Sequence, residues 1–280
     1  MIILFVVYLC IEIYKIEIMK NLKITFMLTI LLLFVMGVQA QTVTPSKNYI
    51  TREVNNVTDF SSIKVLGSPD VEYRQSNDSK TTVLIYGSDN LVDLLDVTTE
   101  NGILRVKMKE GVRILSGERR LKVIASSPSL VRVEVQGSSD VDLKGIIQGS
   151  DLQLNVQGSG DIDAEDLQIA NITGSVKGSG DINLKNVKAT HVKMLVSGSG
   201  DIEVKGVTQQ AMLAVSGSGD ITTDKLMANH VTATVSGSGD IECYASQQLD
   251  ATVAGRGDIE YKGNPSIVNK QGKKNQITRK

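Results

Sequence analysis

The chain has 280 residues with 30 basic and 31 acidic side chains, so its net charge is close to zero. This balance gives no electrostatic reason to expect nucleic acid or an anionic membrane as a partner. Only 4% of the residues are aromatic and tryptophan is absent, a composition that favours a narrow core of stacked Val, Ile and Leu over a globular core with large aromatic anchors.

Residues 1–40 are predicted to be a secretory signal peptide. A basic segment from Met19 to Lys23 precedes an uninterrupted apolar run from Ile24 to Val38, and Val38 to Ala40 resembles a signal-peptidase site. The apolar run is shorter than the roughly 20 residues that cross a bilayer. A membrane anchor is therefore the second interpretation, and we expect no membrane span after cleavage.

The start of the mature chain follows from this prediction. Residues 1–18 form another apolar piece interrupted by charged side chains, which indicates an over-extended translation start with Met19 as the initiator. The mature protein would begin at Gln41 and be exported to the periplasm, the outer-membrane surface or the medium. Residues 41–48 are polar and include a proline, and we expect them to be a flexible lead-in.

A motif, Gly-Ser-Gly-Asp-Ile, recurs about every 20 residues and organises the rest of the chain. A fixed period of about 20 residues is typical of a solenoid, in which each rung buries its apolar face against its neighbours. We therefore predict an all-β solenoid. Together with looser copies at both ends, the motif supplies seven aligned aspartates: Asp140, Asp161, Asp181, Asp201, Asp220, Asp240 and Asp258.

Alignment of the rungs on these aspartates predicts which side chains point inward. Aliphatic residues form three columns, and polar residues alternate with them, as in strands with one dry and one wet face. Five residues before the aspartates lie Val135, Val156, Val176, Val196, Val215, Val235 and Val253. One residue after them lie Val141, Ile162, Ile182, Ile202, Ile221, Ile241 and Ile259. Nine residues before them lie Val131, Leu152, Ile172, Val192, Ala211, Val231 and Leu249. Residues 131–280 are thus predicted to be regular repeats that end in a degenerate last rung.

Residues 49–130 show clear strand signals with a looser period. Ile63 to Tyr73 contains an early variant of the motif, and Thr82 to Asp89 contains a clipped one. The pair Asn101-Gly102 predicts a hairpin turn before a strand from Ile103 to Met108. We expect this segment to form irregular first rungs that cover the open end of the regular stack.

The motif also predicts a tight turn with a structural role. Glycine supplies backbone positions that need a positive φ or are too crowded for a side chain. We expect each aspartate to accept hydrogen bonds from backbone N–H groups of its own turn. This interpretation is preferred to cations between rungs, because calcium needs six to eight oxygens and each rung offers few. The aspartate ladder, Asp140 to Asp258, is therefore our candidate surface site, and no metal, cofactor or catalytic residue is expected.

Three other features have a structural interpretation that we favour. Arg256-Gly257-Asp258 spells an integrin-type tripeptide, but it occupies the place of the ordinary repeat turn. His191 and His230 fall in one polar column two rungs apart, about 10 Å, which is too far to share a metal ion. Cys243 falls at an inward position, which favours a buried apolar thiol over a nucleophile.

The sequence resembles a known family in several places: the Ser-Gly-Ser-Gly-Asp-Ile turns, Phe60 to Ile63, and Asn90 to Leu94 before Gly102-Ile103-Leu104. These features are similar to the head GIN domain family, labelled putative autotransporter adhesins, over residues 55–280. The resemblance implies a right-handed, single-stranded parallel β-helix that is exported to the cell envelope, with adhesion as its label. It carries no catalytic motif to transfer.

From these observations we expect an exported, non-catalytic binding module or adhesin of the cell envelope, because the repeats present uniform polar ladders and no unique cleft. Its partner would be a glycan or an envelope or host surface protein. A structural envelope scaffold is the alternative. A polysaccharide lyase or hydrolase is a third interpretation, but it needs carboxylates and basic side chains clustered on long loops, whereas the corners here are short.

Overall fold

The computed structural model describes residues 41–114, 121–273 and 275–280, so the predicted signal peptide lies outside the described residues. The chain divides into two units, residues 1–42 and 43–280, and β1 (Gln41–Val43) spans their boundary. All that follows concerns the second unit. Within the described ranges, no helix reaches the length and hydropathy that a bilayer crossing requires.

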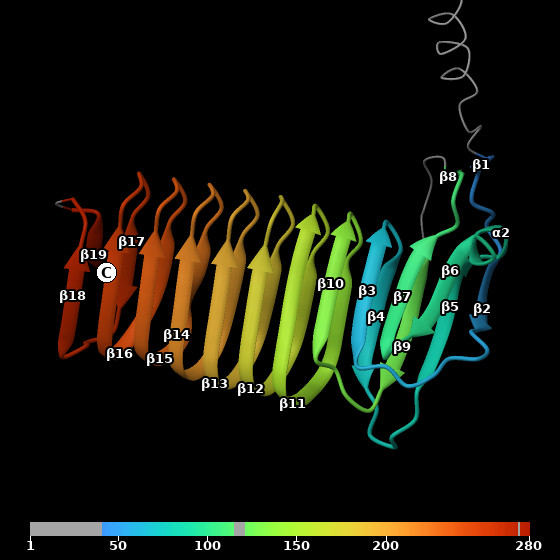
Figure 1. The fold of residues 1–280 in the computed structure, drawn as a ribbon, viewed down its shortest axis with the longest axis horizontal. Helices are drawn as coiled ribbons and strands as arrows, with labels where there is room; N and C mark the ends of the chain where they lie inside the picture. Colours follow the sequence, from blue (N-terminus) through green and yellow to red (C-terminus); the bar gives the residue numbers. More distant parts are fainter. Residues whose placement is uncertain (1–40, 115–120, 274) are drawn as a thin grey trace, which may run out of the picture. The chain divides into compact units, whose positions relative to one another are not determined.

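From β10 onward the chain winds into a β-solenoid whose strands pair in parallel with the strands of the next rung. Val156 lies opposite Val176, and Val176 opposite Val196. The described residues form about seven turns of about 20 residues, which Figure 1 shows stacked side by side. The predicted fold class is confirmed. The strands are β10 (Arg132–Gly137), β11 (Val141–Gly158), β12 (Ile162–Val176), β13 (Ile182–Val196), β14 (Ile202–Val215), β15 (Ile221–Val235), β16 (Ile241–Val253), β17 (Ile259–Lys262), β18 (Ile267–Gln271) and β19 (Ile277–Arg279).

The inward columns predicted from the sequence form the core. Every residue of the valine column and of the column after the aspartates is buried, with Val253 the most exposed at 5%. The third column is buried from Leu152 to Leu249, but the prediction for Val131 is wrong, since this side chain is 43% exposed. The chain enters β10 from the loop that follows β9, and Leu130 is buried there at 1% exposure instead.

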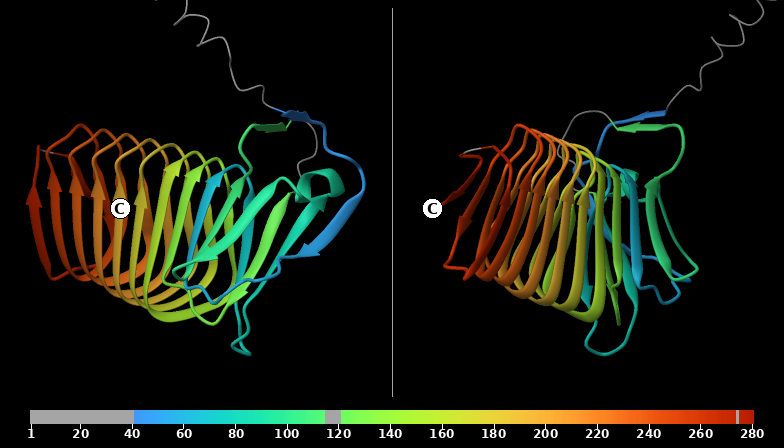
Figure 2. Two further views of the ribbon diagram at one scale, coloured as in Figure 1. Left: turned by 45° about the vertical axis from the view of Figure 1, so that its right-hand side comes forward. Right: turned by 60° about the vertical axis from the view of Figure 1, so that its left-hand side comes forward.

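Each long strand covers two sides of its rung. In β13 the first side begins at Ile182 and the second includes His191 to Val196, with alternating buried side chains on both. The pairing register with β14 shifts between Leu184 and Val187, and Figure 2 shows that the ribbon of each long rung bends between two sides. The outward side chains of a rung therefore belong to two separate outer faces.

The N-terminal segment of the second unit forms a cap from strands of mixed direction. Its elements are β2 (Tyr49–Glu53), β3 (Ser62–Gly67), β4 (Asp70–Gln75), β5 (Thr82–Ser88), α2 (Asp89–Val92), β6 (Leu95–Glu100), β7 (Ile103–Met108), β8 (Val112–Ile114) and β9 (Lys122–Ser127). Ser46 and Asn48, in the predicted lead-in, donate side-chain hydrogen bonds to Asp89 at the start of α2. The core of the cap contains an aromatic pair, Phe60 and Tyr73, with ring centroids 6.4 Å apart.

The rungs of the cap are not stacked in chain order. β3 pairs in parallel with β10 on one side and with β7 on the other, while β4 lies between β11 and β9. Figure 1 shows β3 standing between β7 and β10. The rung made of residues 62–75 therefore joins the cap to the regular solenoid.

β5 is not a rung, so the prediction from its clipped motif is wrong. It runs antiparallel to both β2 and β9, because an alternating pattern specifies a buried face but no strand direction. The hairpin prediction is confirmed: β6 and β7 are antiparallel, and Asn101 and Gly102 have φ values of 52° and 74°, as a two-residue hairpin turn requires.

Candidate functional site

The aspartates of the turn ladder lie in one line along the solenoid, but their hydrogen bonds differ from those predicted. The backbone N–H of Asp161 donates to Oδ1 of Asp140 at 3.0 Å, and that of Asp201 donates to Oδ1 of Asp181 at 2.7 Å. The same pattern continues to the last copy of the motif. The carboxylates from Asp140 to Asp240 thus accept from the next rung, and the expected donors in their own turns are wrong. The ladder also begins earlier than predicted, since Asp140 donates to Asp70 at 3.0 Å.

The glycines of the turns are required by close stacking of the backbone. A Cβ at Gly198 would overlap the carbonyl oxygen of Gly178 in the preceding rung. The N–H of Ser199 donates to this same oxygen at 2.7 Å. The sequence suggested two reasons for glycine, a positive φ and a crowded backbone. Crowding applies at Gly198, whereas Gly158 also has a positive φ of 145°.

The turn ladder is therefore built to hold rungs together. Its carboxylates point at backbone N–H groups, and its glycines allow the backbones to approach. In the part of the chain that the structure describes, no group of three or more His, Cys, Asp or Glu residues could hold a metal ion. Arg256 to Asp258 follows the same pattern, with Arg256 N–H donating to Gly237 O at 2.8 Å and Asp258 N–H to Asp240 at 2.7 Å, which confirms it as an ordinary turn.

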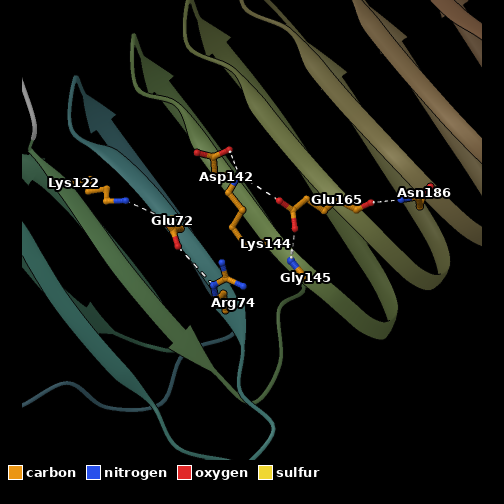
Figure 3. Close-up of polar contacts among 8 residues, drawn as sticks. All are labelled: Glu72, Arg74, Lys122, Asp142, Lys144, Gly145, Glu165 and Asn186. Carbon is orange, nitrogen blue, oxygen red and sulfur yellow. Dashed lines mark hydrogen bonds and ion pairs between the residues drawn. The ribbon is translucent and has the colours of Figure 1, made fainter.

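The outer face that follows each aspartate turn, here called the charged face, carries ion pairs between neighbouring strands. On β4, Glu72 accepts a 2.8 Å hydrogen bond from Lys122 of β9 and lies 3.6 Å from Arg74 (Figure 3). The hydrogen bond from Lys122 holds the pKa of Glu72 below its ordinary value. This contact ties β4 to the outer part of the cap.

A second group on the charged face joins the first two regular rungs. Lys144 lies 3.1 Å from Asp142 and 3.5 Å from Glu165, and Glu165 also accepts from the backbone N–H of Gly145 at 2.9 Å. Figure 3 shows these side chains in a row that continues to Asn186. The hydrogen bond to Asp142 raises the pKa of Lys144. These ion pairs join neighbouring strands, which indicates a structural role for the residues that form them.

The other outer face, here called the groove face, differs in both charge and pairing. It is formed by the outward side chains of residues 168–177, 188–197, 207–216 and 227–236, which contain no Asp or Glu. A groove of about 310 Å³ opens on it. Another hollow, of about 440 Å³, is lined by residues 168–170, 188–190 and 207, so the groove does not overturn the expectation of no unique cleft.

The groove is built from two columns of side chains that the strand register brings together. One column contains Asn171, His191, Gln210 and His230, and the next contains Thr173, Lys193, Met212 and Thr232. His191 Nδ1 lies 2.9 Å from Oδ1 of Asn171, while Met212 is 50% exposed. Gln210 separates the two histidines, as predicted from the spacing. The outward methionine at position 212 was the sequence signal for this groove that the column analysis missed.

Cys243 lies away from both faces, inside the solenoid. It is fully buried, and burial raises the pKa of its thiol to about 12. The predicted buried, apolar thiol is confirmed, since a thiolate is the reactive form of cysteine and is strongly disfavoured here.

The fold and these surfaces define a β-solenoid protein with a regular turn ladder and two chemically distinct outer faces. The chain belongs to the family described as "Putative auto-transporter adhesin, head GIN domain", which matches residues 59–185 and 165–265. This match confirms the resemblance seen in the turns and in the entry to the first rung.

Solved structures support the same assignment. A putative adhesin from Bacteroides fragilis is 29% identical, covers 85% of this chain and 99% of its own, and has a TM-score of 0.65. A putative lipid binding protein from Parabacteroides distasonis is 27% identical, covers 86% of this chain and 100% of its own, and has a TM-score of 0.75. A putative adhesin from the same species, at 23% identity over 85% of this chain and 99% of its own with a TM-score of 0.77, shares the fold. Among curated proteins, none matches.

Proposed function

We propose that this protein is an exported, non-catalytic binding module of the cell envelope that acts as an adhesin through its groove face. The observation that carries the proposal is the contrast between the two outer faces. On the charged face, Glu72 and Lys144 are paired with neighbours. On the groove face, no hydrogen bond or ion pair within the described chain engages the side chains of Lys193, Gln210 and Thr232, so these groups face solvent and are available to a ligand.

The solenoid supports binding because it presents these groups at fixed positions. Successive rungs are about 4.8 Å apart, and the backbone beneath them is held by continuous parallel pairing from β12 to β15. A rigid surface loses little conformational entropy when a ligand binds. Such a surface suits an extended partner, either a glycan or a protein of the envelope or of a host surface.

The side chains of the groove favour binding over hydrolysis. Glycoside hydrolysis generally uses two carboxylates that flank the scissile bond, whereas the ionisable groups that line this groove are His191, Lys193 and His230. The family description and the Bacteroides fragilis neighbour, described as a putative adhesin, agree with a binding role.

Binding is tested by screening the mature protein against an array of glycans and extracellular matrix proteins. The decisive variant is Thr232→Arg, which fills the groove from β15, and its matched control is Thr222→Arg, on the charged face of the same strand. Binding should be lost in the first variant and kept in the second. A protein that binds nothing on the array, or that loses binding equally in both variants, would contradict the proposal and favour a structural scaffold.

Export is tested separately, by cell fractionation and N-terminal sequencing. We expect the protein in the periplasm, at the outer-membrane surface or in the medium, with Gln41 as its first residue. A mature protein that retains Met1 or Met19 would contradict this part of the proposal.

A further inference from the structure

We propose that the groove recognises an acidic polysaccharide, that is, a glycan whose sugars carry carboxylate or sulfate groups. This inference rests on the proposed binding function and narrows its ligand to one chemical class. It follows from the charge of the groove face, from the absence of an internal partner for one lysine within the described residues, and from the other side chains around that lysine.

The groove face is basic although the whole chain has a net charge of −1. Its four segments combine the absence of Asp and Glu with five basic side chains: Lys177, Lys188, His191, Lys193 and His230. In the rungs on either side, carboxylates return to the same columns at Asp151 and Asp250. The chain thus confines a patch without acidic side chains to the rungs of β12 to β15, where the side chains of these rungs attract a ligand with negative charge.

Lys193 is the central cation of this patch. It lies in the column between Thr173 and Met212 and lines the groove, and no carboxylate pairs with it within the described residues. On the charged face, by contrast, two lysines have a carboxylate partner: Lys205 lies 2.7 Å from Glu203 and Lys262 lies 2.6 Å from Asp224. The Lys193 ammonium is therefore free to form a charge-assisted hydrogen bond with an anionic group of a ligand.

The remaining side chains of the groove fit a sugar. Gln210, Thr173 and Thr232 offer amide and hydroxyl groups that both donate and accept hydrogen bonds, as sugar hydroxyls require. Met212, at 50% exposure, offers a polarizable apolar surface beside them for the C–H face of a ring. The volume of about 310 Å³ lies within the range of small-molecule sites.

The shape of the site favours a polymer that lies along the solenoid axis. The groove crosses four neighbouring strands, from Asn171 on β12 to Thr232 on β15, so an extended chain can occupy several rungs at once. A bilayer fits less well: anionic membranes recruit clusters of about four to eight Lys and Arg residues, whereas this face has three lysines, one of which lines a hollow.

The test compares two charge reversals on the same strand. Lys193→Glu inverts the charge in the groove, and Lys185→Glu makes the same change on the charged face of β13. Binding of both variants and of the unmodified mature protein is measured by calorimetry with polygalacturonate, dextran sulfate and uncharged dextran, and by sedimentation with phosphatidylglycerol vesicles. We expect binding to at least one of the two acidic polymers, at least a tenfold loss in Lys193→Glu, less than a twofold loss in Lys185→Glu, and weakening by added salt.

Several outcomes would overturn the inference. Equal losses in the two variants would indicate attraction without a site, and vesicle binding that depends on Lys193 would make the ligand a lipid surface. No binding to either acidic polymer would also reject it. If a neutral glycan or a protein still bound in a way that Thr232→Arg abolished, the proposed adhesin function would stand while the acidic ligand would be wrong.

Discussion

The carboxylate of Asp181 accepts a 2.7 Å hydrogen bond from the backbone N–H of Asp201, one rung further along the solenoid. In return, the carbonyl oxygen of Asp201 accepts from the N–H of Ile182 at 3.0 Å. The two bonds connect neighbouring rungs where the strand pairing stops. Each aspartate therefore continues the ladder of the sheet through the turn, which explains its recurrence without a ligand.

The first prediction concerns this inter-rung bond. Asp201→Ala removes the acceptor for the N–H of Asp220, which lies 2.7 Å from the carboxylate, and should lower the free energy of unfolding by about 1.5 kcal/mol, as expected for a hydrogen bond to a charged group. Urea unfolding measures it. Asp258→Ala is the control, because this carboxylate accepts no hydrogen bond within the described residues; equal losses in both would argue against the inter-rung role.

The second prediction tests the inward columns. Val196 is fully buried, so Val196→Asp places a charge without a partner in a dry core and should cost more than about 3 kcal/mol or prevent folding. Lys193→Glu, three residues earlier but outward, should change stability by less than about 0.5 kcal/mol. Thermal unfolding of the two variants decides this, and comparable shifts in Tm would mean that the columns are misassigned. The same measurement shows whether the groove variant remains folded.

The third prediction concerns pH. Because Lys122 holds the pKa of Glu72 below its ordinary value, the stabilisation from this carboxylate is present above the unfolded pKa, about 4.3, and is lost as the pH falls through the lower folded pKa. Glu72→Gln should reduce the free energy of unfolding at neutral pH by about 1 kcal/mol or less. The difference from the unmodified protein should disappear in acid. A loss that is independent of pH would show that packing, not charge, is affected.

The fourth prediction concerns calcium. The ladder carboxylates from Asp140 to Asp240 each accept a backbone hydrogen bond, as Asp220 does from Asp240 at 2.7 Å, and a calcium ion needs six to eight oxygens. Calcium should therefore raise the Tm no more than magnesium or sodium chloride at the same ionic strength. If calorimetry found a large stabilisation that is selective for calcium, the prediction would be wrong and the ladder would be a metal-binding element.

The sequence predicted most of the regular solenoid because each column repeats one side-chain type at one position. Val156, Val176 and Val196 all point inward for the same reason, so errors in one rung are corrected by its neighbours. Where the repeat begins, this support is lost. The rung beside Val131 is not the preceding turn of the chain, because β10 stacks on β3. At this position Leu130 is buried and Val131 is exposed.

Strand direction and hydrogen-bond partners were harder to predict than burial. The pattern of β5 is compatible with parallel or antiparallel pairing, and its contacts with β2 and β9 decide for antiparallel. Similarly, an aspartate after a glycine turn can accept from its own turn or from the next rung. The choice depends on how closely the turns stack. The structure shows this closeness, since a Cβ at Gly198 would overlap the backbone of the preceding rung, but the residue types alone do not. The groove depends on long-range register in the same way.

β3 lies between β7 and β10, and β4 lies between β9 and β11. This arrangement gives the folding of the chain a direction. A chain that emerges N-terminus first has made every strand of the cap before Arg132 appears. The exposed edge of residues 62–75 then serves as a template on which β10 can nucleate parallel pairing. Bringing β10 to that edge closes a loop of about 70 residues, while each later rung closes one of only about 20, and loop-closure entropy grows slowly with length. The two closures differ by only about 1 kcal/mol, so the long first loop is no obstacle, and we expect the edge of the cap to serve as the template from which rungs are added toward the C-terminus.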